Sequence, residues 1–154
     1  MNHILEEIVR TGKVLSADGT QSLALHSNVS ADEGLLIASI IQSIKPSLSV
    51  EIGLAYGTSA LYICDALRRS NAAAKHIIID PSQNAPGSWQ GIGLANLERA
   101  GFSAMVEFIE KPSQIALPEL VSSRRSLDFA FIDGWHTFDH ALVDFFCRST
   151  SPSA

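Results

Sequence analysis

The chain has 154 residues, of which 46% are hydrophobic and 18% are charged, and its formal net charge is −5. This length and composition suit one globular domain with an apolar core and exclude a disordered chain. The negative charge disfavours nucleic acid and anionic membranes as partners. The longest apolar run, residues 34–41, is far shorter than a membrane span of ~20 residues. The N-terminus has no signal-peptide pattern, so we expect a cytoplasmic protein.

The first part of the chain predicts a helix, a loop and a second helix. Apolar residues recur at helical spacing over 1–12, and residues 13–29 are polar and rich in turn formers, which indicates a loop. Ser30 and Glu33 have the spacing of a capping box, in which each side chain bonds the other residue's backbone N–H. A helix should therefore follow to about Ser43.

From residue 48 onward, predicted strands and helices alternate. We predict strands over 48–52, 76–80, 105–110 and 127–133, and helices over 58–69, 91–100, 113–121 and 137–146. This alternation is typical of an α/β fold, here a Rossmann-like parallel sheet of about four strands with helices on both faces. Residues 147–154 form a polar tail without a strand pattern. We expect a C-terminally truncated chain, the alternative being a naturally short four-stranded protein.

Ligands of such sheets bind beyond the carboxyl ends of the strands, and the first strand ends in a glycine-containing loop. Gly53 and Gly57 allow the backbone to turn tightly and to approach a ligand, and Thr58 or Ser59 can cap the following helix. A dinucleotide site would need Gly-x-Gly-x-x-Gly, and its second and third glycines are missing here. An ordinary strand-to-helix turn is the alternative interpretation.

The other three strand ends also carry polar side chains. Asp80 can accept both hydroxyls of a ribose, or cap a turn. Ser113 and Gln114 can read an adenine edge, although Ser113 is also a plausible helix cap. Asp133 can hold an ammonium group or a divalent metal, and His136 can be a general base near neutral pH or a structural histidine.

In their order along the chain, these strand ends resemble the class I S-adenosylmethionine (SAM)-dependent methyltransferases. The segment from Glu51 to Ser59 is similar to that family's first motif, with Ala55 where glycine is usual, and residues 131–145 resemble catechol and caffeoyl-coenzyme A O-methyltransferases. The resemblance implies a strand order of 3-2-1-4. It divides the chain into an N-terminal helix and loop (1–29), a partial SAM-binding domain (30–146) and the tail (147–154).

The resemblance also implies a set of site residues. The cofactor-binding residues would be Glu51, Gly53, Ala55, Gly57, Thr58, Ser59, Asp80, Ser113, Gln114, Asp133 and Trp135. Glu51 would support the loop or the amino group of SAM, Asp80 would bind the ribose, and Trp135 would pack beside the cofactor. The catalytic residues would be His136 and Asp133, of which Asp133 matches a magnesium ligand of the metal-dependent members.

The implied function is SAM-dependent methyl transfer to an oxygen of a small molecule. One expected outcome is that this chain, being truncated, is inactive. In the metal-dependent members, the other magnesium ligands come from a fifth strand. The sequence pattern of this chain lacks that strand, and one aspartate would not suffice for Mg²⁺. The alternatives are another nucleotide-dependent enzyme, such as a dehydrogenase, or a non-enzymatic α/β domain. A bare sheet edge would favour a homodimer in that last case.

Overall fold

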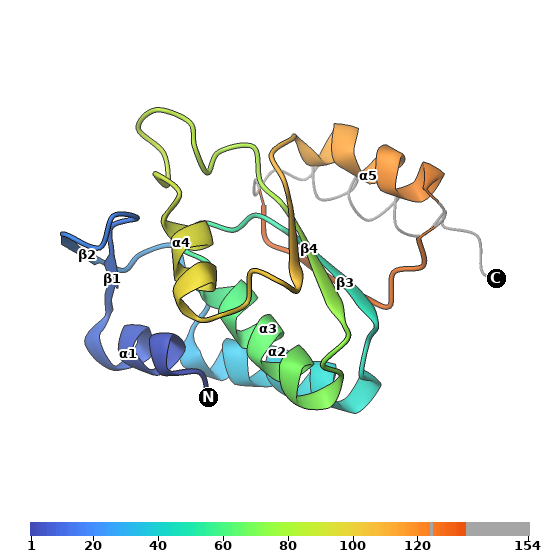
Figure 1. Ribbon diagram of the computed structural model, residues 1–154, viewed down its shortest axis with the longest axis horizontal. Helices are drawn as coiled ribbons and strands as arrows, with labels where there is room; N and C mark the ends of the chain where they lie inside the picture. Colours follow the sequence, from blue (N-terminus) through green and yellow to red (C-terminus); the bar gives the residue numbers. More distant parts are fainter. Residues whose placement is uncertain (124, 135–154) are drawn as a thin grey trace.

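A computed structural model describes residues 1–123 and 125–134 of the chain (Figure 1). The predicted helix over 137–146 and the tail over 147–154 lie outside the described residues. Within the described part, one helix covers one face of a four-stranded parallel sheet, the other helices lie on the opposite face, and a two-stranded hairpin stands beside them. No described helix is both long enough and apolar enough to cross a membrane.

The N-terminal part begins with helix α1 (His3–Thr11), which Asn2 caps. Strands β1 (Lys13–Leu15) and β2 (Ser22–Ala24) follow and pair antiparallel. The prediction of an uninterrupted loop over 13–29 is therefore wrong. Strands of three residues are too short to show an alternating pattern, and their position depends on tertiary contacts.

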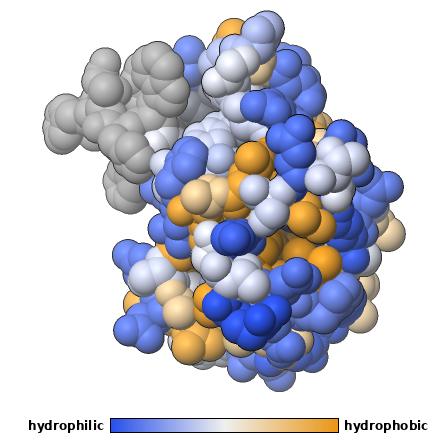
Figure 2. All heavy atoms as spheres, turned by 90° about the vertical axis from the view of Figure 1, so that its left-hand side faces the viewer, coloured by the Kyte–Doolittle hydropathy of each residue, from blue (hydrophilic) through white to orange (hydrophobic). Residues whose placement is uncertain are grey.

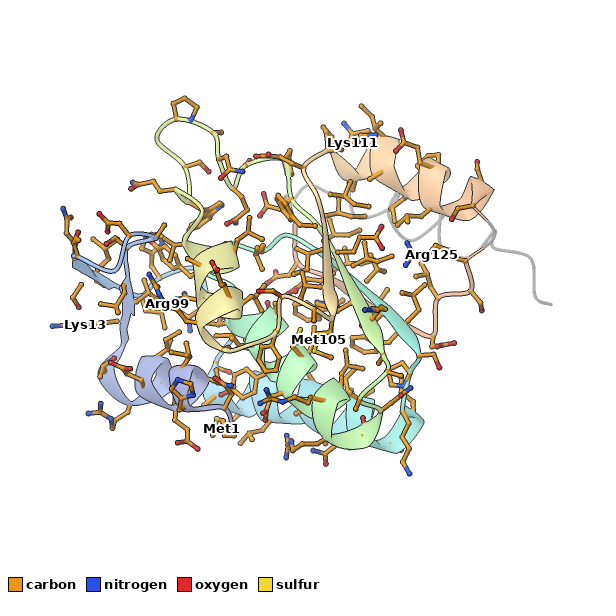
Figure 3. All side chains as sticks on the ribbon, in the orientation of Figure 1. Met1, Lys13, Arg99, Met105, Lys111 and Arg125 are labelled. Carbon is orange, nitrogen blue, oxygen red and sulfur yellow. The ribbon has the colours of Figure 1, made fainter. Side chains whose placement is uncertain are left out.

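Two polar contacts fix this hairpin. Asp18 closes the turn by accepting a hydrogen bond from the backbone N–H of Thr20 at 3.0 Å. Arg99, on the neighbouring helix, points at the turn and donates to the carbonyl oxygens of Ser16 and Ala17 at 2.7 and 2.9 Å (Figure 3).

On the face that carries the hairpin, apolar side chains gather near the middle and hydrophilic ones border them (Figure 2).

Helix α2 (Ala31–Ile44) confirms the predicted capping box. The backbone N–H of Glu33 donates to the Ser30 hydroxyl at 3.3 Å, and the N–H of Ser30 donates to the Glu33 carboxylate at 2.7 Å. The helix packs closely on its neighbour, because a Cβ placed on Gly34 would lie 2.2 Å from the ring of Tyr62.

The sheet has the predicted topology. Its strands are β3 (Leu48–Ile52), β4 (Lys75–Ile79), β5 (Val106–Ile109) and β6 (Phe129–Ile132), and they run parallel in the order β5-β4-β3-β6. This order is the 3-2-1-4 that we expected. The connecting helices are α3 (Thr58–Ser70), α4 (Ile92–Arg99) and α5 (Ser113–Ser122).

The two faces of the sheet bury different side chains. Val50 and Ile52 of β3 pack toward α5, whereas the opposite face packs against the layer of α1 to α4. The strands are apolar because both faces are covered. Three polar exceptions, Ser49, Glu51 and His76, are fully buried, and their hydrogen bonds help to build the candidate site.

Candidate functional site

A cleft of about 1120 Å³ opens beyond the carboxyl ends of β3, β4 and β6. Parallel strands deliver their ends to one edge, so residues far apart in sequence meet there. The predicted residues that line it are Gly53, Ala55, Thr58, Ser59, Asp80, Ser113, Gln114 and Asp133. Glu51 lies beneath the loop instead of in the lining, Gly57 is also absent from the lining, and Trp135 and His136 lie outside the described residues.

The loop between β3 and α3 has three residues in the left-handed region. Gly53, Ala55 and Gly57 have φ values of +89°, +48° and +79°. Glycine adopts these angles freely, whereas alanine pays a steric cost for its Cβ. The N–H of Gly57 donates to the carbonyl oxygen of Leu54 at 2.7 Å, which closes the turn at the edge of the cleft.

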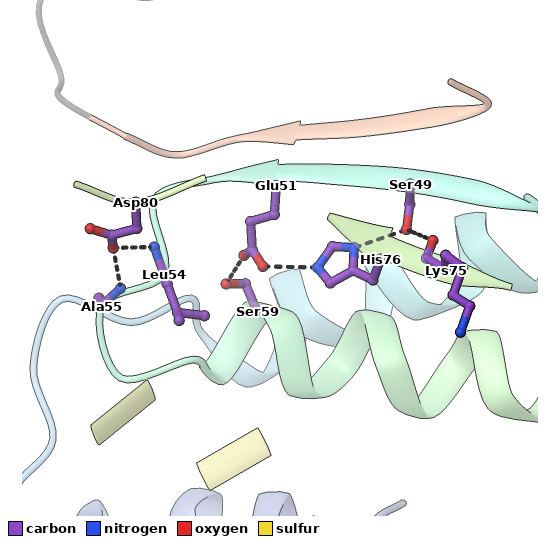
Figure 4. A network of polar contacts seen from close by, with 8 residues as sticks. All are labelled: Ser49, Glu51, Leu54, Ala55, Ser59, Lys75, His76 and Asp80. Carbon is purple, nitrogen blue, oxygen red and sulfur yellow. Dashed lines mark hydrogen bonds and ion pairs between the residues drawn. The ribbon is translucent and has the colours of Figure 1, made fainter. Parts of the chain in front are cut away.

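Asp80 holds this loop in place (Figure 4). Its Oδ2 atom accepts hydrogen bonds from the backbone N–H groups of Leu54 at 2.8 Å and Ala55 at 3.4 Å. Its Oδ1 atom accepts from the N–H of Ser82 at 2.7 Å, so Asp80 also closes a turn of its own loop. Because each carboxylate oxygen has two lone pairs, Oδ1 retains acceptor capacity beyond this bond.

Sequence reasoning missed Gln83, which completes this arrangement. The side chain is fully buried, and its Nε2 atom donates to the carbonyl oxygen of Ala55 at 2.9 Å and to Asp80 Oδ2 at 3.2 Å. Its Oε1 atom has no hydrogen-bond partner among the described residues. An amide in a polar loop gives no sequence signal of this role.

A buried chain of polar side chains runs between the sheet and α3 (Figure 4). The Ser59 hydroxyl donates to Glu51 Oε1, and His76 Nε2 lies 3.1 Å from Glu51 Oε2. His76 Nδ1 lies 2.9 Å from the hydroxyl oxygen of Ser49. Glu51 thus joins the first turn of α3 to β4, and its expected role in supporting the loop or the amino group of SAM stays a prediction. Ser49 and His76 were missed, although polar residues within apolar strands were an available signal.

The predicted caps of α3 and α5 are wrong. The N-cap of α3 is Gly57, so Thr58 and Ser59 lie inside the first turn and make no capping bond. Likewise, Pro112 precedes α5, and Ser113 is its first residue. A left-handed glycine and a proline already set the direction in which the chain enters these two helices, and Thr58, Ser59 and Ser113 line the cleft. The first N–H groups of α3 lie next to this lining and have no helical partner.

An aromatic cluster reaches the cleft through Trp89. The Tyr56 hydroxyl lies 2.9 Å from His26 Nε2, and the rings of Tyr56 and Trp89 are 5.1 Å apart. Trp89 itself lines the cleft. The three residues come from separate loops, so no sequence spacing predicts the cluster.

Two carboxylates face the cleft from its other sides. The backbone and hydroxyl of Ser30 donate to Glu33 and lower the pKa of that carboxyl below its usual value. Asp133 is exposed at the end of β6, and its N–H donates to the carbonyl oxygen of Ile52 at 2.9 Å. Within the described residues, no group of three or more His, Cys, Asp or Glu side chains is placed to hold a metal ion.

Comparison with known proteins gives consistent similarities. The family model described as "Methyltransferase domain" matches residues 50–149. The flavonoid 3',5'-methyltransferase of Vitis vinifera is 28% identical over 109 residues, which cover 69% of this chain and 43% of the relative. Caffeoyl-CoA O-methyltransferase 2 of Petunia hybrida is 31% identical over 107 residues, 68% of this chain and 41% of the relative. The chain thus spans less than half the length of these relatives.

Solved structures share the fold. The O-methyltransferase from Bacillus cereus in complex with SAH superposes with a TM-score of 0.75 at 19% identity, over 99% of this chain and 63% of that one. The O-methyltransferase TomG from Streptomyces achromogenes, in complex with SAM, gives 0.74 at 18% identity, over 99% and 62%. These likenesses confirm the expected Rossmann-like architecture.

Proposed function

This chain belongs to the methyltransferase domain family, and from that premise we propose that the cleft binds SAM and that the protein transfers the methyl group to an oxygen of a small molecule. The observation that carries the proposal is the cleft itself. Its lining joins the glycine-containing loop, Asp80, the Ser113–Gln114 pair and Asp133, which come from four separate strand ends. The same residues, in the same order, carry the family resemblance of the sequence.

The cleft fits SAM in size and in chemistry. Pockets for small molecules commonly have volumes of roughly 300–1000 Å³, and this open cleft has about 1120 Å³. The Oδ1 atom of Asp80 offers an acceptor for a ribose hydroxyl, and Ser113 and Gln114 offer polar groups for the adenine edge. The N-terminus of α3 offers N–H groups for a carboxylate. Val29, Leu36 and Ile37 add an apolar wall.

Bound SAM would supply a methyl group activated by its sulfonium. The residues of this chain would hold the two reactants in line and exclude water between them, which is the main way to accelerate such a transfer. His136 would accept the proton of the acceptor hydroxyl at a ring nitrogen, Trp135 would pack beside the cofactor, and Asp133 would hold a cationic group at the mouth of the cleft. Asp133 would also be one ligand of a magnesium ion, whose other ligands would come from outside the described residues.

Isothermal titration of the full chain with S-adenosylhomocysteine (SAH) and SAM tests the cofactor. We expect saturable binding by a sample that unfolds cooperatively, and no heat at millimolar ligand would contradict the proposal. Titration with NADH, followed by its fluorescence, is the matched control for the dehydrogenase alternative. Transfer of a labelled methyl group to a panel of catechols and other hydroxylated aromatics then tests the reaction, with and without Mg²⁺.

Self-association and a cytoplasmic location stay predictions. Leu36, Ile40 and Ile44 recur at helical spacing on α2 and are 60%, 39% and 48% exposed. An exposed apolar stripe of this kind favours contact with another protein surface. A homodimer would be seen as a doubled mass in light scattering behind size-exclusion chromatography, and a monomeric mass at high concentration would exclude it.

A further inference from the structure

Helix α4 connects the N-terminal hairpin to the loop between β3 and α3 (Figure 1). Gly93, Asn96 and Arg99 stand at intervals of three residues on this helix, so they are neighbours along one ridge of its surface. The glycine lies at the end of the ridge that meets the loop, and the arginine lies at the end that meets the hairpin. A single helix thus contacts both segments with one row of residues.

At the loop, α4 makes one backbone contact and one hydrogen bond. A Cβ placed on Gly93 would lie 2.6 Å from the carbonyl oxygen of Ala55, and a Cβ placed on Gly57 would lie 3.1 Å from that of Gly93. Asn96 is 2% exposed, and its Nδ2 atom donates to the carbonyl oxygen of Tyr56 at 3.0 Å. The loop therefore rests directly on α4, and a displacement of the helix would displace the loop.

Asn96 and Arg99 are themselves joined. The Oδ1 atom of Asn96 accepts a hydrogen bond from Arg99 Nη1 at 3.2 Å. The two partners fix the orientation of the amide, because the carbonyl oxygen of Tyr56 only accepts and the guanidinium only donates. The same guanidinium donates to the carbonyl oxygens of Ser16 and Ala17 in the hairpin turn. An unbroken series of hydrogen bonds thus runs from the hairpin turn to the loop.

Apolar packing attaches the hairpin only in part. Val14 is buried and Leu23 packs against the core, but a groove of about 90 Å³ lies between the hairpin, α1 and α4. Asn96 and Arg99 are both in the lining of this groove. Atoms that face a gap lose their van der Waals contacts on that side. The polar contacts of Arg99 therefore carry a larger share of the attachment.

A second connection joins the end of the hairpin to the same tyrosine. The N–H of Leu25 donates to the carbonyl oxygen of Gly12 at 2.9 Å and closes the base of the hairpin. The next residue, His26, places its Nε2 atom 2.9 Å from the Tyr56 hydroxyl. Residues 27–29 then line the cleft. Tyr56 is thus held at its carbonyl group by α4 and at its hydroxyl group by the segment that follows the hairpin.

We propose that Asn96 and Arg99 are positioning residues, which make the ligand-binding shape of the loop between β3 and α3 depend on the folded hairpin. The inference rests on the proposed function, because it takes SAM as the ligand, and it goes further by giving the hairpin a role in binding. Neither side chain is in the lining of the cleft, so both act through the loop. Such coupling is reciprocal, so a ligand that binds the loop also stabilises the hairpin.

Two substitutions test the coupling from opposite ends in the ligand-free full chain. Arg99→Ala removes the hairpin contacts, and amide exchange should accelerate at the N–H groups of Leu54 and Gly57, which Arg99 does not touch. Asn96→Ala removes the loop contact, and exchange should accelerate at the N–H of Leu25. We expect changes of about tenfold in NMR-detected exchange, because both variants lose the charge-assisted bond between the two side chains.

Calorimetric titration with SAH measures the consequence for the cleft. Arg99→Ala should weaken SAH binding about fivefold or more, which is the usual size of coupling between two sites. In the wild type, saturating SAH should slow exchange at the N–H of Leu25, and Arg99→Ala should abolish this response. Arg69→Ala is the matched control, because Arg69 also lies in the last turn of its helix but bonds Asp65 of that helix. It should keep the wild-type result in both measurements.

The possible failures are distinguishable. If the wild type does not bind SAH, the proposed function is overturned and the inference with it. If SAH binds and Arg99→Ala keeps either the wild-type affinity or the wild-type exchange at Leu54 and Gly57, only the inference is overturned. Thermal unfolding identifies a variant that does not fold. The wild type alone then decides, because unchanged exchange at Leu25 in saturating SAH overturns the inference without any variant.

Discussion

Gly53 and Asp133 meet through their backbones, because a Cβ placed on Gly53 would lie 2.5 Å from the carbonyl oxygen of Asp133. The same Cβ would lie 3.0 Å from the Cα atom of Gly134. The two strand ends are also joined by the hydrogen bond from Asp133 to Ile52. Gly53, the first residue of the loop, thus sets the distance between the loop and Asp133, which we propose to hold a cationic group at the mouth of the cleft.

Gly53→Ala should separate these two strand ends. The new methyl group meets backbone atoms that cannot move aside, at a φ of +89° that alanine avoids. We expect a loss of about 2–4 kcal/mol in the free energy of unfolding, measured by chemical denaturation, together with weaker SAH binding. Gly101→Ala is the matched control, since Gly101 has a φ of +74° and nothing within 4 Å of the added Cβ. Equal losses in the two variants would contradict the steric explanation.

Ala55→Gly should stabilise the protein. Ala55 has a φ of +48°, in the left-handed region that costs an L-residue about 1–2 kcal/mol. Glycine removes this cost but adds about 0.4–1 kcal/mol of chain entropy to the unfolded state, so a net gain of about 0.5–1 kcal/mol is expected. Chemical denaturation measures it. A loss of stability would mean that the Ala55 methyl group makes packing contacts worth more than the strain.

Protonation of Asp18 should open the hairpin turn at low pH. Hydrogen bonds from the Ser16 hydroxyl, and then from the backbone and hydroxyl of Thr20, lower the pKa of Asp18 from 3.8 to about 2. A lowered carboxyl pKa means that the stabilising contribution is present above pH 3.8 and is lost as the pH falls through about 2. A carbon-detected NMR titration of the carboxyl group checks the midpoint. In Asp18→Asn the pH dependence of the hairpin signals over this range should vanish, and a wild-type midpoint near 3.8 would refute the assignment.

Much of the sheet could be predicted because its signals are local. Residues 76–80 contain an apolar run, residues 48–52 carry an apolar side chain at every second position, and the residues between them have helical spacing. The capping box at Ser30 and Glu33 fixed the start of α2 to the residue. The β1–β2 hairpin could not be predicted in this way, because Arg99, which lies more than eighty residues away in sequence, holds its turn.

The candidate site was predictable where topology alone brings residues together. Asp80 and Asp133 stand directly after strands, Ser113 begins the helix that follows β5, and parallel strands end at one edge. The contacts of Gln83 and the cluster of His26, Tyr56 and Trp89 depend on how loops fold over one another, which no spacing encodes. The roles of Trp135 and His136 stay predictions, since both lie outside the described residues.

Asp80→Asn should affect both the loop and the cofactor. The amide keeps the size of the carboxylate but loses acceptor capacity toward the N–H groups of Leu54 and Ala55, which Asp80 Oδ2 now satisfies. We expect a loss of about 1–3 kcal/mol in the free energy of unfolding. The affinity for SAH should fall about tenfold, because the amide also lacks the charge that strengthens a hydrogen bond from a ribose hydroxyl.

Asp128→Asn separates these two effects. Asp128 Oδ2 likewise accepts from two backbone N–H groups, those of Ser47 at 2.7 Å and Leu48 at 3.1 Å, but at the opposite end of β3 from the cleft. Its side chain is exposed, so this variant should lose less stability and keep the wild-type affinity for SAH in the same titration. If Asp80→Asn and Asp128→Asn bind SAH equally well, Asp80 does not contribute to the cofactor site, and its role is confined to holding the loop.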